Sequence, residues 1–322
     1  MSLLDYRTVD SISIQNPSRN LIDVINEMED VQEWMRDYLI KNDTSKLAFV
    51  GAYKNSTEIN EIVESIRYSL NLKEDWFNEV TDERDAFKKL RVRLEACGVI
   101  IMAGGYVGQN NRKKIDIEEF RAFTLIDEYA PLIFINTNDS KGGRLFSLLH
   151  EVAHIWLGRD NFFNDRNNVI HSVSKEETIC NAVAAELLVP NRIFNQKWKS
   201  HERDTNYFDK ILSVAQEFKC GITVIARRAL DNGLIGIDKY NEVAGYAKQK
   251  YKEQQEKQKE SSKGSGNFYN NLSYRLDNRF ISALNNSIYE GTTTFTEAYR
   301  LTNTTRKTFS TLVDKIRGSN NE

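Results

Sequence analysis

Apolar residues recur at helical spacing through the first third of the chain. Residues 17–45 and 57–70 place an apolar side chain on the same side every three or four positions, which predicts two amphipathic helices. A third helix is predicted from about residue 82 to 96, and Gly98 is suited to end it. The first part of the chain, residues 1–80, is therefore expected to be a helical N-terminal region.

The pattern then changes to short runs typical of strands. VIIMAG, residues 99–104, is one such run, and residues 118–126 and 131–137 flank the turn sequence DEYA. A hairpin and a small antiparallel sheet are therefore predicted. Residues 131–137 have two interpretations. As an edge strand they could pair with an extended peptide; as a core strand they would need apolar residues on both faces, which they have.

Two helices follow the predicted hairpin. The first contains residues 146–158, and the second has the sequence KEETICNAVAAELLV and stops before Pro190. Residues 207–234 have the pattern helix, glycine turn, helix. Such a pair can read DNA, but it more often only packs in a core.

A charged and then Ser/Gly-rich segment, residues 248–266, is predicted to be a linker. It separates a central domain at residues 81–247 from a small C-terminal domain at residues 267–322. The aromatic residues of that small domain can form its core or a surface for a partner. The fold class expected from these elements is α+β and mostly helical.

Composition narrows the class of protein. Of 322 residues, 40% are hydrophobic and 28% charged, with a formal net charge of −2, which is typical of a globular protein and gives no overall attraction to nucleic acid or anionic membranes. Cys97, Cys180 and Cys220 are few and widely spaced, which favours a reducing compartment. Neither a membrane span nor a signal peptide is recognisable. A cytoplasmic protein is expected.

The stretch FSLLHEVAHIWLG, residues 146–158, carries the clearest chemistry. His150 and His154 lie one helical turn apart, so both imidazoles can reach one Zn²⁺ at roughly 2.0–2.1 Å. Glu151 projects beside that position and can accept a proton from the attacking water, as in the HExxH motif. The alternative is a chance match on an ordinary buried helix, which would leave these polar groups to be satisfied in other ways.

A catalytic zinc usually has three protein ligands, and the next helix offers the third. We expect this ligand to be Glu177, and Asn181, one turn later on the same face, to hydrogen-bond a ligand histidine. Glu176 and Glu186 are the competitors, but they lie about 100° from the Asn181 face and about 180° from Glu177, respectively. Glu177 can instead be a solvated charge at a helix N-terminus.

The transition state also needs a donor for the developing oxyanion. His171, in the loop before the second helix, is the best candidate, with Tyr129 and His201 behind it. A surface histidine without a role is the more common outcome.

HEVAH followed by E-x-x-C-N-x-x-A-A-E-x-L-x-P resembles the ImmA/IrrE-type metallopeptidases, which are gluzincin-like and related in plan to thermolysin. Similar segments occur along nearly the whole chain, including LDYRT, QEWMRDYL, FVGAY and the tail from GNFYNN. The resemblance implies a zincin-like core, zinc held by His150, His154 and Glu177, and catalysis by Glu151. It also implies a bacterial or phage cytoplasmic protein that cuts or inactivates a helix-turn-helix repressor of the Xre or Cro/CI type.

The chain differs from many members of the family in one respect that changes which partner is expected. Many long relatives begin with an Xre-type DNA-binding domain, and residues 1–16 are too short for one. Direct DNA binding is therefore doubtful, and a separate repressor is the expected partner. The sequence leaves open a zinc endopeptidase, a non-enzymatic binder of a repressor or antitoxin-like protein on the same fold, and a DNA-binding regulator that uses residues 207–234.

Overall fold

The structure is a computed structural model of the whole chain, and it describes residues 17–158, 175–201, 206–261 and 268–319. Its strands are β1 (Ile100–Gly104), β2 (Ala122–Leu125) and β3 (Leu132–Asn136). Its helices are α1 (Arg19–Lys41), α2 (Ile59–Ser69), the 3₁₀ helix η1 (Trp76–Glu79), α3 (Glu83–Cys97), α4 (Lys141–Leu157), α5 (Lys175–Leu188), α6 (Asn191–Ser200), α7 (Tyr207–Phe218), α8 (Ile222–Asp231), α9 (Ile237–Ser261), α10 (Phe268–Arg275), α11 (Asn278–Tyr289), α12 (Phe295–Thr302) and α13 (Arg306–Ser319). The mostly helical α+β class is confirmed.

The sheet has the strand order β1-β3-β2. The predicted hairpin is present, because β2 and β3 pair antiparallel. The sheet as a whole is mixed rather than antiparallel, since β1 pairs with β3 in parallel. β3 thus pairs with β2 on one side and with β1 on the other, and β1 runs in the same direction as β3. Because β3 has a neighbour on both sides, the edge-strand interpretation of residues 131–137 is wrong and the core-strand interpretation is confirmed.

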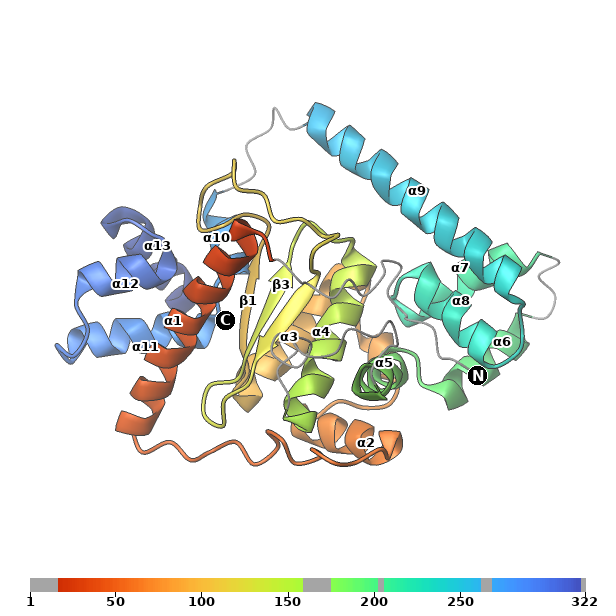
Figure 1. Cartoon of the computed structure of the whole chain (residues 1–322), viewed down its shortest axis with the longest axis horizontal. Coiled ribbons are helices and arrows are strands. Elements are labelled where there is room, and N and C mark those ends of the chain that lie inside the picture. Colours follow the sequence, from red (N-terminus) through yellow and green to blue (C-terminus); the bar gives the residue numbers. More distant parts are fainter. Residues whose placement is uncertain (1–16, 159–174, 202–205, 262–267, 320–322) are drawn as a thin grey trace.

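Helices cover both faces of this sheet, which makes three layers (Figure 1). Along β3, Ile133 and Ile135 belong to the core shared with α3 and α4. Leu132 and Phe134 belong to a second core, shared with α1 and the C-terminal helices. The alternation of side chains along a strand accounts for this division. It also gives β2 a face toward α4.

Helix α4 has a defined beginning and end. Its N-cap, Ser140, accepts a hydrogen bond from the Gly143 N–H at 3.0 Å. At its other end Gly158 takes a left-handed conformation with φ 66°. A Cβ at Gly158 would lie 2.6 Å from the Cα of Gly51, whose N–H caps the Ile155 carbonyl at 2.9 Å. The FVGAY segment therefore fixes the C-terminal end of α4.

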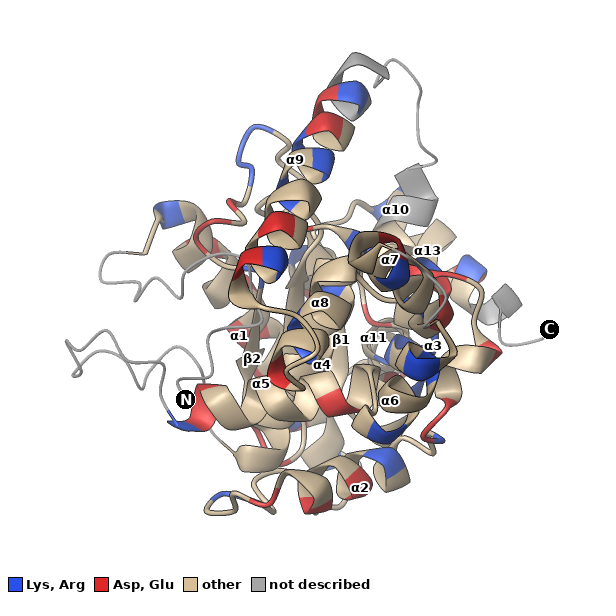
Figure 2. Cartoon of the chain, turned by 90° about the vertical axis from the view of Figure 1, so that its right-hand side faces the viewer, with Lys and Arg blue, Asp and Glu red and all other residues tan. Residues whose placement is uncertain are grey.

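The terminal parts of the chain meet on one side of the sheet. α1 packs with the helices that follow residue 268, whereas α2 packs against α4 and α5. α9 extends through Ser261, so the first part of the predicted linker is helical and carries interspersed positive and negative side chains (Figure 2). Within the described residues, no helix combines the length and the apolar composition needed to cross a lipid bilayer.

A buried ionic cluster fastens the C-terminal helices to the sheet. Arg91 Nε donates to Glu95 Oε1 at 2.6 Å, and both side chains belong to α3. Asp277, the fully buried N-cap of α11, accepts the N–H of Ile101 on β1 at 3.0 Å and that of Phe280 at 2.9 Å. Glu95 and Asp277 thus share a buried region with Arg91, and Arg279 lies near both acids.

This cluster predicts a pH dependence of stability. Burial, followed by the nearby Asp277, raises the pKa of Glu95 to about 7, although Arg91 opposes the shift. Between its usual pKa of about 4.3 and this value, the folded protein keeps a proton that the unfolded chain has lost. The free energy of unfolding is therefore expected to fall by about 3 kcal/mol as the pH rises through this window.

Urea unfolding at about pH 5 and about pH 8 measures this change. Glu95→Gln should remove most of the difference, whereas Glu128→Gln, at an exposed position in the hairpin turn, should keep it. An unchanged pH profile in the Glu95→Gln protein would show that another group is responsible.

Candidate metal centre

Helices α4 and α5 pack closely, and small residues allow this. Ala184 and Ala185 on α5 are fully buried in the core that also contains α4. α5 consequently lies directly against α4 (Figure 1). His150 and His154 come from α4, and Glu177 comes from the first turn of α5.

The three side chains predicted as metal ligands converge. His150 Nε2 lies 3.3 Å from Glu177 Oε2, and His154 Nε2 lies 3.3 Å from Glu177 Oε1. The two Nε2 atoms lie 3.1 Å apart. Both imidazoles are almost completely buried, while 25% of the Glu177 side chain is exposed. Of these three side chains, Glu177 is therefore the one that reaches solvent to a substantial extent.

These separations fit a tetrahedral divalent cation. Two ligand atoms at roughly 2.0–2.1 Å from a zinc ion, at a tetrahedral angle, lie about 3.3 Å apart. The separation of the two Nε2 atoms is close to this value, and each Nε2 lies 3.3 Å from a different oxygen of Glu177. Two imidazole nitrogens and one carboxylate are also the donor set of the His₂Glu catalytic zinc sites. Within the part of the chain that the structure describes, these residues are the group of His, Cys, Asp and Glu side chains positioned to hold a metal ion.

The electrostatics of the cluster favour an ionised carboxylate. Burial alone would raise the pKa of Glu177, but the His150 and His154 rings outweigh burial and hold this pKa well below its usual range. Burial opposes charge on His154 as well, yet contacts with Cys180 and Glu177 raise its pKa well above the usual value. The carboxylate therefore carries the negative charge of the cluster, which favours a cation between it and the two rings.

Cys180 lies beside the same histidine. It is fully buried one turn after Glu177, and its thiol forms a hydrogen bond with the His154 ring. Burial raises the pKa of Cys180, so the thiol keeps its proton despite the opposing effect of His154. A neutral thiol can thus orient the imidazole.

Glu151 lies next to the cluster and is held by the sheet. Its side chain is 1% exposed, and its Oε2 accepts a hydrogen bond of 2.7 Å from Thr124 Oγ1 on β2. Thr124 is itself fully buried, because it occupies the face of β2 that packs on α4. The strand therefore positions one carboxylate oxygen of Glu151 by a hydrogen bond.

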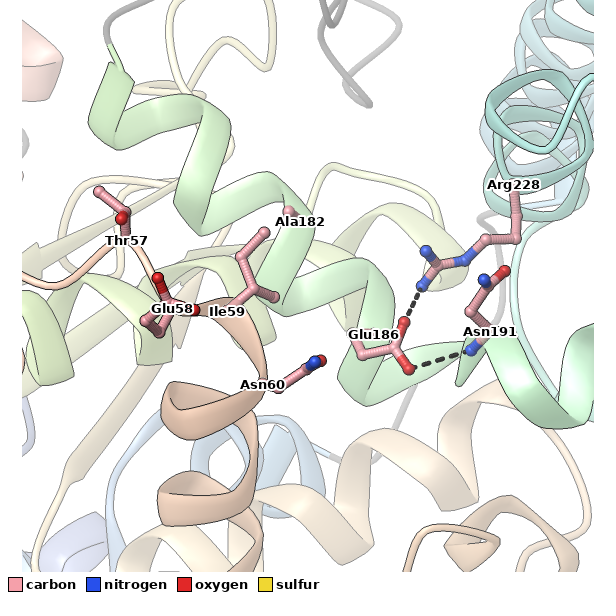
Figure 3. A pocket seen from close by; sticks show the side chains of 8 residues that line it. All are labelled: Thr57, Glu58, Ile59, Asn60, Ala182, Glu186, Asn191 and Arg228. Atoms are coloured by element: carbon pink, nitrogen blue, oxygen red, sulfur yellow. Dashed lines mark hydrogen bonds and ion pairs between the residues drawn. The ribbon is translucent and has the colours of Figure 1, made fainter.

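The competing acids behave differently. Glu186 turns to the far side of α5, where its carboxylate accepts bonds from Arg228 Nη2 at 2.9 Å and from the Asn191 N–H at 3.0 Å. Figure 3 shows these contacts at a pocket that is also lined by residues 57–60 at the start of α2. Glu176 is not part of the described metal-binding group, although it lies next to Glu177.

The other predicted residues have mixed outcomes. Asn181 is buried on α5, and its role as a partner of a ligand histidine stays a prediction. His171 falls in residues 159–174, outside the described part of the chain. His201 bonds Glu217 at 2.6 Å, and Tyr129 packs with the second core, on the α1 side of the sheet.

Thr124 and Cys180 are the site residues that the sequence analysis missed. Cys180 could have been found, since it lies three residues after Glu177 and so on a neighbouring part of the same helix face. Thr124 gives only a weak signal, namely a hydroxyl at a buried position of a short strand. Its partner Glu151 is far away in sequence.

Comparisons with known proteins agree with this geometry. The family model for the IrrE N-terminal-like domain, a peptidase family, matches residues 109–230, and a model for a domain of unknown function matches residues 276–315. The comparisons with curated proteins and with solved structures found no match. The first matched segment contains β2, β3, α4 and α5 and therefore the whole cluster. Residues 109–230 are therefore an IrrE N-terminal-like domain of a peptidase family, in agreement with the resemblance of the HEVAH segment to the ImmA/IrrE-type metallopeptidases.

Proposed function

We propose that the protein is a zinc-dependent endopeptidase whose metal is held by His150, His154 and Glu177. The observation that carries the proposal is the convergence of these side chains: the two Nε2 atoms lie 3.1 Å apart, and each lies 3.3 Å from one of the two Glu177 oxygens. Membership in a metallopeptidase family supports it. A bound zinc ion would lower the pKa of a water molecule and polarise the substrate carbonyl.

Glu151 carries out the proton transfers of the proposed reaction. Its carboxylate accepts the proton of the attacking water and returns it to the leaving amine, as a general base and then a general acid. Its Oε2 accepts the Thr124 hydroxyl, which fixes the orientation of the carboxylate for this proton transfer. Its burial beside the cluster shields the transfer from bulk water.

The proposed substrate is a helix-turn-helix transcriptional repressor of the Xre or Cro/CI type. The support is the resemblance to ImmA/IrrE-type proteins, which act on such repressors. We place this activity in the cytoplasm, because the three cysteines are free thiols, as expected in a reducing compartment.

Incubation of the zinc-loaded protein with repressors encoded by neighbouring genes tests the proposal. One repressor should be cut at a single position, and a chelator should abolish the cut. Repressors that are bound but never cut, with zinc present, would favour the alternative of a non-enzymatic binder.

Thr124→Val should lower the cleavage rate about 10–100-fold, the usual cost of losing an outer hydrogen-bond partner at a metal site. Valine keeps the shape of threonine but cannot donate to Glu151. The effect should appear in kcat, with KM and zinc content unchanged. Measured with the cut repressor, Thr124→Ser should recover most of the rate.

A matched control is available in the C-terminal helices. Thr302 is also buried, and its hydroxyl donates to the Ala298 carbonyl at 2.6 Å. Thr302→Val removes a buried hydroxyl without touching the cluster. If both valine variants slowed cleavage equally, the loss would come from general destabilisation and not from Glu151.

A further inference from the structure

Helices α12 and α13 form a unit that the peptidase site does not use. α12 spans Phe295–Thr302, residues 303–305 make a turn, and α13 spans Arg306–Ser319. Asn303 ends α12 in the left-handed conformation, with φ 50°. A short helix, a tight turn of about three residues and a longer helix are the elements of a helix-turn-helix. The match to a domain of unknown function, residues 276–315, covers the turn and most of the unit.

One side of α13 is committed to packing. Phe309, Leu312, Val313 and Ile316 are buried at the spacing of a single helix face. The Phe309 ring lies 5.8 Å from the ring of Tyr299 on α12, edge to face. α10 and α11 also pack against α13. These contacts hold α13 at a fixed angle and leave its opposite side facing outward.

The outward side of α13 is basic and polar in its first two turns. Arg306, Lys307 and Ser310 are exposed, Thr311 is half-exposed, and the first acid is Asp314 in the third turn. These are side-chain types that hydrogen-bond base edges in the major groove, with arginine and lysine directed to guanine. In a helix-turn-helix the N-terminal residues of the second helix make such contacts.

Acidic groups of α1 lie near this unit, but they are engaged. Asp30 forms an ion pair with Arg300 on α12. Glu27 accepts a hydrogen bond from Asn303 Nδ2 at 3.4 Å. Arg300 thus offsets the charge of Asp30, and both contacts hold α12 in place.

A basic loop adds to the same end of the molecule. The Gln109 side chain donates to the Asn303 carbonyl, so the loop that follows β1 touches the turn between α12 and α13. Arg112 and Lys114 in this loop are exposed. They are available for phosphate contacts beside the recognition helix.

The other helix pair, α7 and α8, has the opposite character. Arg227 and Arg228 of α8 are buried and pair with Asp231 and Glu186. α8 therefore offers no exposed basic face to DNA. Residues 207–234 belong to the core, at the end of the molecule opposite α12 and α13 (Figure 1).

We infer that α12 and α13 are a DNA-binding helix-turn-helix, and that α13 enters the major groove of duplex DNA. Arg306, Lys307 and Ser310 face the bases, and the loop with Arg112 and Lys114 contacts the backbone. This inference does not depend on the proposed peptidase function. The chain then binds DNA directly, whereas the sequence analysis had made direct DNA binding doubtful.

Fluorescence anisotropy of the full chain with a labelled random-sequence duplex of about 30 base pairs tests the inference, at about 50 mM salt and above. The variant R306A/K307A should weaken binding at least about tenfold, because it removes two positive charges from the side of α13 that meets the DNA. The matched control is K252A/K257A, which removes the same charge from exposed positions on α9.

Each outcome decides the question. Duplex retention that is lost in R306A/K307A and kept within about twofold in the control supports the inference, as does enrichment of one sequence from a randomised duplex pool by the wild type alone. Equal weakening in both variants, or no retention by the wild type at low salt, overturns it. So does a wild type that ignores DNA while R306A/K307A loses capture of a repressor protein, because that result makes the surface a protein-docking site. Unchanged unfolding midpoints show that both variants are folded.

Discussion

Glu151→Gln is expected to lower repressor cleavage by about 10²–10⁴-fold and to leave zinc bound. Glutamine has the shape of glutamate and can still accept the 2.7 Å hydrogen bond from Thr124 through its side-chain oxygen. It cannot take a proton from water, so the loss should fall on the chemical step. Single-turnover cleavage, together with metal analysis of the same sample, measures both quantities.

Glu128→Gln provides the control for this variant, since Glu128 is exposed in the turn between β2 and β3. It should cut at the wild-type rate. A Glu151→Gln protein that still inactivates the repressor fully, with zinc bound, would contradict catalysis by this residue. The same result is what the non-enzymatic binder predicts, so this comparison separates the two functions.

Glu177→Ala is expected to weaken zinc binding at least about 100-fold, because loss of an outer-shell partner alone typically costs 10–100-fold. The carboxylate contacts both imidazoles at 3.3 Å and is held ionised by them, so it supplies the negative charge of the cluster. Competition with a chelating indicator measures the affinity.

Glu176→Ala is the matched control, because Glu176 precedes Glu177 on α5 and lies outside the metal-binding group. Its zinc affinity should equal that of the wild type. If Glu176→Ala lost zinc and Glu177→Ala kept it, the third ligand would be the neighbouring acid and the assignment would be wrong.

The convergence of His150, His154 and Glu177 could be predicted because helices repeat regularly. The i, i+4 spacing of His150 and His154 fixes their common side, and the small residues of α5 indicate the face that packs on them. Glu177 is predicted as the third ligand because it lies on that face of α5. Helix positions in the first third of the chain were also readable, since α1, α2 and α3 each carry a clear apolar stripe.

Strand order and long-range contacts were not readable in the same way. The sequence of a strand does not show which strands it pairs with. The parallel pairing of β1 with β3 and the central position of β3 are therefore seen only in the structure. The Thr124–Glu151 hydrogen bond depends on that order. The packing of α1 with the C-terminal helices likewise joins segments that are far apart in sequence and share no local pattern.

The most direct measurement is an anomalous difference map, collected at the zinc edge from crystals of the zinc-loaded protein. One strong peak is expected at bonding distance, roughly 2.0–2.2 Å, from His150 Nε2, His154 Nε2 and a Glu177 oxygen. The carboxylate of Glu151 should lie beside this peak without binding it. A peak elsewhere, or an ion bound by the two histidines while Glu177 points away, would contradict the proposed metal site.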